Sequence, residues 1–167
     1  MEQATADNAA KTRRYYEELW NNRNFDVIPD WIAPGFVGHY TSRPEPVRGV
    51  AGFRAFVDEL LTAFPDARLT ILDQVVEGEK VVSRVELRGT HQGELLGFAP
   101  TGQAVTVTYV GIERYEDGLC VEEWVYSDDL ALSRQIKALP EPGSRGERIG
   151  WALHRLSARR LRRKAGG

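Results

Sequence analysis

The sequence contains little cysteine and histidine and has no long apolar run. Cys120 is the only cysteine among 167 residues, which excludes an intramolecular disulfide and a thiolate metal cluster within one chain. The three histidines include no pair at helical or strand spacing, so we expect no metal site. No segment approaches the roughly 20 apolar residues of a membrane span, and residues 1–14 lack the apolar run of a signal peptide. We expect a cytoplasmic protein without stable membrane insertion.

Charge is distributed unevenly along the chain. The formal net charge is −2, but residues 140–167 contain eight Arg or Lys and two Glu, a surplus of +6 that leaves −8 for residues 1–139. An acidic body argues against nucleic-acid binding, because phosphate recognition needs a basic surface. The length suits one well-buried core. We therefore predict one domain over residues 1–139 and a basic C-terminal extension, partly helical or disordered, over residues 140–167.

The spacing of apolar residues predicts helices first and strands afterwards. Helical spacing covers residues 7–22, 25–32 and 49–64. The period then changes to two, which predicts strands over residues 69–76, 81–90, 105–115 and 119–126, followed by a short helix over 129–138. Residues 77–79 and 116–118 have the composition of tight hairpin turns. This order indicates an α+β domain in which helices cover one face of a curved antiparallel sheet.

The segment from His91 to Gln103 is long for a hairpin connection. It contains Leu95, Leu96 and Phe98 among several glycines. Long loops with their own apolar residues are more often functional than plain connections. We expect this loop to cover the mouth of a pocket, with Phe98 in contact with a ligand.

The last predicted strand ends in a carboxylate. If Trp124, Tyr126 and Asp128 share one face, they form an aromatic pocket with one acid–base group. Asp128 also directly precedes a predicted helix, where Asp is a favoured N-cap, so capping is a second interpretation. A one-residue change of register would instead bring Asp129 to the cavity.

Other candidates accompany this carboxylate. His39 and His91 are the two histidines near strand ends that could transfer protons. Arg84 and Glu86 alternate on one strand and either form an inward ion pair that orients the acid or belong to a solvated face. Further residues predicted to line the cavity are Trp20, Phe53, Tyr109, Trp124 and Tyr126.

Three groups of residues carry a family resemblance. The segments 89–102 and 114–118, and the combination of Glu123-Trp124 with Asp128, Leu132 and Gln135, are similar to the SnoaL-like polyketide cyclases. Segments 18–21, 36–39 and 64–66 resemble the same family, which belongs to the nuclear-transport-factor-2-like superfamily. The resemblance covers about residues 8–138.

The resemblance implies a cone in which a bent sheet encloses a hydrophobic cavity. It also implies a cofactor-free intramolecular aldol closure of a polyketide intermediate, with Asp128 as general base and then acid, and a homodimer or larger homo-oligomer. One carboxyl group can serve both steps in sequence. Burial beside Trp124 and Tyr126 would raise its pKa toward the working pH.

One position departs from the family pattern. The aldol cyclases carry a histidine three positions before the Arg that Arg114 matches, whereas this chain has Gly111. His39, His91 or Tyr109 would then polarise the carbonyl, or the reaction is an isomerisation, dehydration or hydrolysis at the same carboxylate. A cone that binds a small molecule without catalysis is a further alternative, since the fold alone does not define chemistry.

Overall fold

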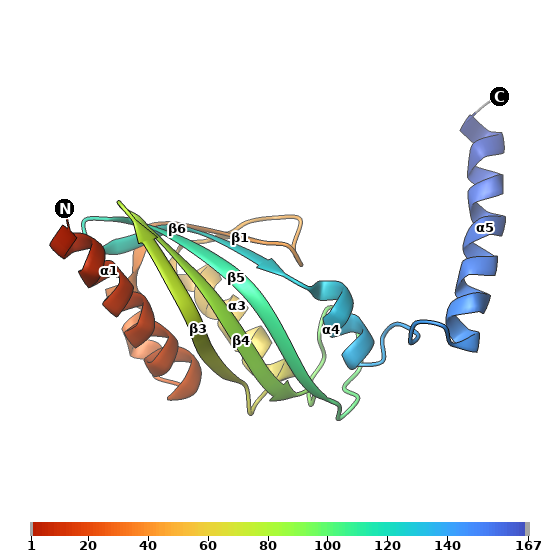
Figure 1. Ribbon diagram of the computed structural model, residues 1–167, viewed down its shortest axis with the longest axis horizontal. Coiled ribbons are helices and arrows are strands. Elements are labelled where there is room, and N and C mark those ends of the chain that lie inside the picture. The colour runs from red at the N-terminus through yellow and green to blue at the C-terminus, as the bar shows by residue number, and fades with distance from the viewer. Residues whose placement is uncertain (1, 166–167) are drawn as a thin grey trace.

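The computed structural model describes the backbone of residues 2–165 and the side chains of residues 7–158. Its main body is a strongly curved, unclosed sheet with helices on its concave side (Figure 1). The six strands lie in the order β2-β1-β6-β5-β4-β3. Their bounds are β1 Ile32–Tyr40, β2 Val47–Arg48, β3 Arg68–Glu77, β4 Lys80–Thr90, β5 Ala104–Glu116 and β6 Leu119–Ser127. The α+β class expected from the sequence is confirmed.

The helices follow the predicted segments closely. They are α1 Glu2–Tyr15, η1 Tyr16–Asn21, η2 Phe25–Val27, α2 Ile28–Trp31, α3 Gly49–Ala63, α4 Asp129–Gln135 and α5 Arg145–Ala165. Element η1 is a π-helical turn that continues α1. A π turn contains one more residue than an α turn. The change of period lets the neighbouring side chains Tyr15 and Tyr16 both be buried, together with Leu19 and Trp20.

The sheet is the predicted meander with two added strands, β1 and β2. Strands β3 to β6 pair antiparallel in sequence order, as expected. Strand β1 joins the edge of β6 in parallel, with His39 opposite Trp124 and Tyr40 opposite Val125. Parallel pairing needs a long crossover, and here α3, β3, β4 and β5 separate the two strands in the chain. The apolar segment around Phe36 is therefore a sheet strand.

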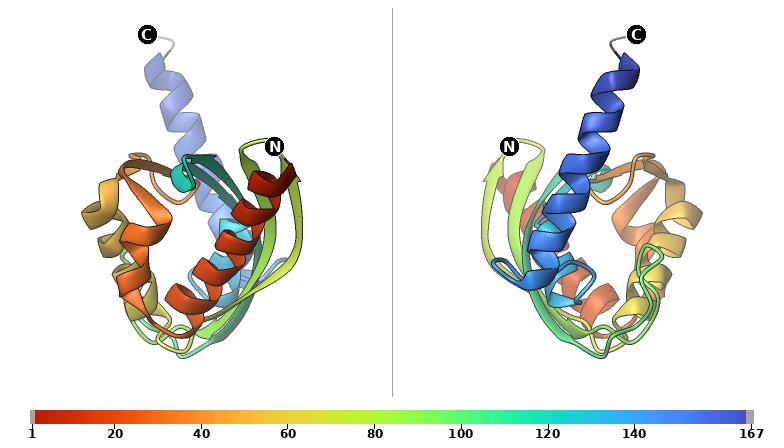
Figure 2. Two further views of the ribbon diagram at one scale, coloured as in Figure 1. Left: turned by 90° about the vertical axis from the view of Figure 1, so that its left-hand side faces the viewer. Right: turned by 90° about the vertical axis from the view of Figure 1, so that its right-hand side faces the viewer.

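An aromatic cluster joins the helices to the sheet. The rings of Tyr15 and Trp31 stack with centroids 3.5 Å apart, and Phe53 of α3 lies 5.6 Å from Trp31. The indole Nε1 of Trp31 donates a hydrogen bond of 2.8 Å to the hydroxyl of Tyr115 on β5. Buried aromatic rings contribute large apolar area, and their polar atoms need partners. This cluster joins the helices to the concave face of the sheet, and Figure 2 shows end-on how the helices lie over that face.

The C-terminal extension forms helix α5, which stands away from the cone (Figures 1 and 2). Its large apolar side chains are more than half exposed, namely Ile149, Trp151, Leu153 and Leu156. Among the described side chains, every buried apolar residue lies between Ala9 and Ile136. Within residues 2–165, no helix is long and apolar enough to cross a membrane.

Deleting residues 140–167 is expected to leave the stability of the cone unchanged. The extension adds no described residue to the core, so the melting temperature should shift by about 2 °C or less. The matched destabilising control is Phe53→Ala in the full chain, which removes a buried ring and should cost about 3–5 kcal/mol. Thermal unfolding followed by circular dichroism measures both. A truncation as damaging as Phe53→Ala would mean that α5 packs on the cone.

Candidate active site

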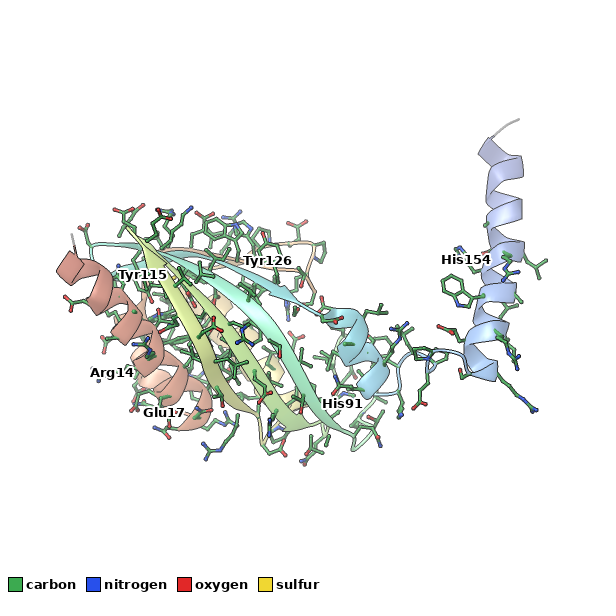
Figure 3. All side chains as sticks on the ribbon, viewed as in Figure 1. Arg14, Glu17, His91, Tyr115, Tyr126 and His154 are labelled. Atoms are coloured by element: carbon green, nitrogen blue, oxygen red, sulfur yellow. The ribbon has the colours of Figure 1, made fainter. Side chains whose placement is uncertain are left out.

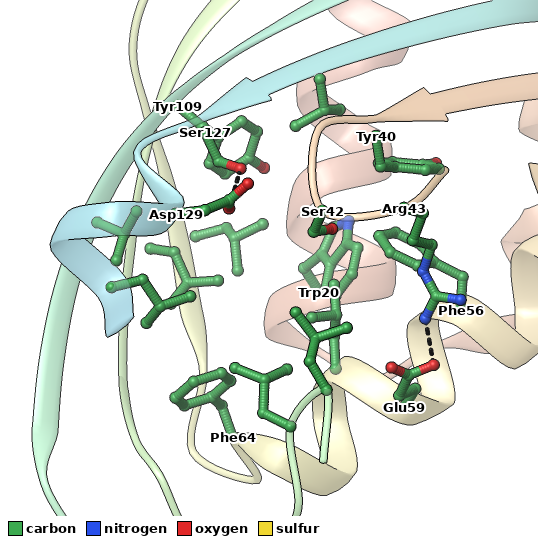
Figure 4. Close-up of a pocket in the computed structure, with 18 of the residues that line it drawn as sticks. Trp20, Tyr40, Ser42, Arg43, Phe56, Glu59, Phe64, Tyr109, Ser127 and Asp129 are labelled. Atoms are coloured by element: carbon green, nitrogen blue, oxygen red, sulfur yellow. Dashed lines mark hydrogen bonds and ion pairs between the residues drawn. The ribbon is translucent and has the colours of Figure 1, made fainter. Parts of the chain in front are cut away.

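A cavity of about 140 Å³ lies between the concave face of the sheet and helices η1 and α3. A buried water needs roughly 10–15 Å³ on this scale, so the space is large enough for an organic ligand. Among the residues predicted from the sequence to bind the substrate, Trp20, Phe53, Phe98 and Tyr109 line it. Most of its wall is aromatic or aliphatic (Figure 4).

The loop at residues 91–103 covers part of this cavity. Leu95, Leu96 and Phe98 line it, and Leu95 and Phe98 hydrogen-bond to each other through their backbones. The amides of Gln92 and Gly93 both donate to the carbonyl of Ala63 at the end of α3. The prediction that this loop borders a pocket is confirmed.

The face of strand β6 that lines the cavity is opposite to the one predicted from the sequence. Glu123, Val125 and Ser127 line the cavity. Trp124 and Tyr126 lie on the other face of the strand, where the Tyr126 side chain is 56% exposed and both border a separate surface depression. The placement of Trp124 and Tyr126 in the cavity is therefore wrong, because successive side chains on a strand point to opposite faces.

The two neighbouring aspartates have different surroundings. Asp128 is exposed and caps α4, and its Oδ1 accepts a hydrogen bond of 2.8 Å from the amide of Ala131. Asp129 lines the cavity, where its Oδ1 accepts a hydrogen bond of 2.6 Å from the hydroxyl of Ser127 (Figure 4). The prediction that Asp128 lies in the cavity is therefore wrong. Asp128 is the N-cap of α4, and Asp129, the alternative one residue further along, lies in the pocket.

Gln135 attaches the C-terminal end of helix α4 to strand β5. The backbone amide of Thr106 on β5 donates to Gln135 Oε1 at 2.8 Å, and Gln135 Nε2 donates to the carbonyl of Thr106 at 3.0 Å. A two-fold contact of this kind restrains the helix at its C-terminal end, while Asp128 restrains its first turn. The position of Asp129 is therefore held from both ends of α4.

The histidines are not brought to Asp129. His39 stacks on Trp124 with ring centroids 5.7 Å apart, and its Nε2 lies 3.1 Å from Glu122 Oε1. His91 is fully buried beneath the loop, with Nδ1 at 3.1 Å from the Thr101 hydroxyl. Neither lines the cavity. His154 lies on α5 away from the cone (Figure 3). His39 and His91 therefore do not stand where the sequence-based prediction placed them.

Arg84 and Glu86 belong to the outer face of β4. Arg84 Nε donates a hydrogen bond of 2.7 Å to Asp73 on the neighbouring strand, and Arg88 Nε donates one of 2.7 Å to Glu86. Both arginines are largely exposed. The solvated-face alternative therefore describes Arg84 and Glu86, and a cavity role for them is not supported by their placement.

Two buried carboxyl groups were not predicted from the sequence. Glu113 on β5 and Glu123 on β6 are directly paired across the antiparallel ladder, with exposures of 0% and 4%. The hydroxyl of Tyr40 donates a hydrogen bond of 2.7 Å to Glu123 Oε2. The hydroxyl of Tyr16 lies 3.5 Å from Glu113 Oε1. Glutamate is seldom fully buried unless paired, so this pair is an unusual feature of the core, and Glu123 presents it to the cavity.

Burial changes the ionisation of both groups. It raises the pKa of Glu123 to about 7, against an opposing effect of the Tyr40 hydrogen bond. Burial, and then the charge of Glu123, raise the pKa of Glu113 well above its ordinary value. Desolvation disfavours the charged form of a carboxyl group, and a second carboxylate nearby adds to this. Two carboxyl groups of the cavity therefore lie in different surroundings. Glu123 is buried and its pKa is about 7, whereas Asp129 is hydrogen-bonded to the hydroxyl of Ser127.

A charged pair lies across the pocket from Asp129. Arg43 Nη2 forms an ion pair with Glu59 Oε2, and its guanidinium lies 5.3 Å from the centre of the Phe56 ring. Figure 4 shows this pair facing the Ser127–Asp129 pair across the apolar space. The pocket thus combines an apolar body with a few polar groups, as small-molecule sites do.

This geometry defines a cone-shaped small-molecule site with carboxyl groups suited to acid–base work. The sequence pattern of the SnoaL-like polyketide cyclase family matches residues 10–136, and the chain belongs to that family. Its fold is nuclear-transport-factor-2-like, and it is a polyketide cyclase-like enzyme.

Individual relatives agree with this assignment. The chain is 26% identical to aklanonic acid methyl ester cyclase AcmA of Streptomyces galilaeus, over 78% of this chain and 91% of the relative. It is 29% identical to aklanonic acid methyl ester cyclase DnrD of Streptomyces peucetius, over 74% and 86%. The crystal structure of the SnoaL-like protein of Jannaschia sp. CCS1 matches with a TM-score of 0.76 at 30% identity, over 81% of this chain and 95% of that one.

The buried acid predicts a stability that falls as the pH rises. Glu123 keeps its proton to about pH 7 in the folded chain, while the ordinary value is 4.5, so the folded state binds more protons between these pH values. The free energy of unfolding should therefore decrease across this window, by on the order of 3 kcal/mol. Glu123→Gln should reduce the slope. Urea unfolding at several pH values measures it.

The control for this experiment is Glu94→Gln, which changes an exposed carboxyl group in the loop. It should leave the dependence on pH as in the wild type. If Glu123→Gln and wild type lose stability equally between pH 4.5 and 7, Glu123 is not protonated in the folded chain.

Proposed function

We propose that this enzyme closes a ring in an oxygenated, polyketide-derived substrate by an intramolecular aldol reaction that needs no cofactor. The observation that supports this most directly is the position of Asp129. It is an acid–base group inside an apolar cavity, with one oxygen hydrogen-bonded to Ser127. The two aklanonic acid methyl ester cyclases among the relatives suggest a related ester as substrate.

The chemistry requires one group that first accepts and then returns a proton. Asp129 removes the proton from a carbon activated by adjacent carbonyl groups, and the resulting enolate carbon attacks a second carbonyl carbon of the same molecule. A carbon–carbon bond forms while the carbonyl π bond opens to an alkoxide. The protonated Asp129 then gives its proton to that oxygen, so atoms and charge balance. A carbon between two carbonyls is acidic enough for a carboxylate to act as base.

The surroundings of Asp129 suit both halves of this cycle. The Ser127 hydroxyl donates to one carboxylate oxygen, which leaves the other free to face the substrate. The hydroxyl of Ser127 also lies 3.0 Å from the Thr41 hydroxyl, so a short chain of hydroxyl groups orients the Asp129 carboxyl group. The apolar walls hold the flexible substrate compactly, which favours ring closure over reaction with water.

The two aspartates provide a matched pair of variants. Asp129→Asn is expected to lower the rate of ring closure by roughly 10²- to 10⁴-fold, the usual contribution of a positioned acid–base group. Asp128→Asn is expected to retain activity and stability, because Asn also caps helices well. The assay follows aklanonic acid methyl ester by chromatography in ²H₂O, where mass spectrometry also detects exchange of the acidic carbon-bound proton.

The outcomes separate the candidate functions. Exchange without any new product would show proton removal alone. An open-chain product of unchanged mass would indicate an isomerisation at the same carboxylate, and a product lighter by one water would indicate dehydration. Retained ligand binding without exchange or turnover would indicate a binding protein. Full activity of Asp129→Asn together with loss in Asp128→Asn would return the catalytic role to Asp128.

A further inference from the structure

The inner end of the cavity contains polar side chains that have no role in the proposed ring closure at Asp129. Tyr15, Tyr16, Tyr40 and Glu123 line this end, and each is less than 8% exposed. Glu123 and Ser127 are four residues apart on one face of β6, a separation of roughly 13 Å along a strand. Glu123 and Asp129 therefore address different parts of any ligand that fills the space between them.

No cation among the described side chains compensates the two buried carboxyl groups. Within residues 7–158, no Lys, Arg or His forms an ion pair with Glu113 or Glu123. The titratable groups that interact electrostatically with this pair are Tyr15, Tyr16, Tyr40, Tyr109, Tyr115 and Cys120. Burial raises the pKa of each of these phenols and of the thiol, so they are neutral at physiological pH. An uncompensated buried carboxyl group is stable only when protonated.

Hydrogen-bonding capacity remains unused here. Glu113 is fully buried, and its Oε2 has no hydrogen-bond partner among the described residues. Glu123 receives one hydrogen bond from Tyr40 at Oε2, and a protonated carboxyl group still has an O–H to donate. Buried polar atoms without partners are costly. Glu123 lines the cavity, so an oxygen atom of a ligand at this end could accept a hydrogen bond from its protonated carboxyl group.

We propose that Glu123, with Tyr40 beside it and Glu113 behind it, forms a second oxygen-binding subsite that holds the far end of the substrate. Its ligand is an uncharged carbonyl or phenol oxygen on a fused aromatic system. The protonated carboxyl group offers an O–H donor, the surrounding walls are apolar, and no described cation pairs with Glu113 or Glu123. An anionic group would be repelled once Glu123 ionises. The subsite orients the substrate, so that the reacting carbon lies at Asp129.

This subsite rests on the proposed function for the class of ligand, but its test needs no turnover. The probes are 2-acetylnaphthalene, which carries a carbonyl oxygen, and 2-ethylnaphthalene, which has a similar shape without it. Their dissociation constants for the full chain are measured by calorimetry between pH 5.5 and 8.5. In the wild type we expect the carbonyl compound to bind roughly 3- to 10-fold more tightly at pH 5.5. This advantage should decline with a midpoint near pH 7.

Two variants tie the effect to Glu123. Glu123→Gln keeps a donor that does not titrate, so the advantage of the carbonyl compound should persist to pH 8.5. Tyr40→Phe removes the hydrogen bond that lowers the pKa of Glu123, so the midpoint should move to higher pH. Near-ultraviolet circular dichroism establishes that both variants are folded.

Three results would overturn the subsite. They are equal binding of the two compounds by the wild type, an advantage independent of pH in the wild type, and the same midpoint in wild type and Glu123→Gln. Tighter binding of naphthalene-2-methylamine above pH 7 than of either neutral probe at pH 5.5 would indicate a cation site and also contradict the proposal. If the wild type shows no ring closure but binds the two naphthalene probes as expected, the proposed reaction is refuted and the subsite is not.

Discussion

The pairing of β5 with β6 decides which side chains enter the cavity. Val110 lies opposite Tyr126, Ile112 opposite Trp124, and Glu113 opposite Glu123. Paired residues on neighbouring strands point to the same face of a sheet, so this register sends both glutamates inward and both aromatic residues outward. A one-residue shift would reverse every assignment. The buried acids and the position of Asp129 both follow from this ladder.

Most of the fold could be predicted from the sequence. Helix α3 and the four meander strands have strong periodicity, and they were predicted within about three residues of their observed ends. The loop that borders the pocket was predicted from its length and apolar content. The two-residue strand β2 and the parallel contact of β1 with β6 were not predicted, since they depend on long-range pairing and carry no local pattern.

The face of β6 was predicted wrongly for a physical reason. Aromatic side chains usually point inward and charged ones outward, which favoured Trp124 over Glu123. The register of the hairpins contained the opposite signal: Arg84 is charged, and the ladder connects it through Val110 to Tyr126. If Arg84 faces solvent, Tyr126 must share its face. Charge on β4 was therefore a better guide than aromatic content on β6, but only once the strand pairing was known.

The same register explains how two carboxyl groups of similar intrinsic acidity acquire different surroundings. Asp129 lies beyond the end of β6 with a hydroxyl partner, while Glu123 is enclosed by phenols and faces a second acid. A Cβ at Gly111 would lie 3.3 Å from the Tyr16 hydroxyl and 3.4 Å from Glu113 Oε1. The space that a side chain would need there is already occupied by these groups. The glycine thus permits the buried acid pair, and environments of this kind separate acids from bases within one site.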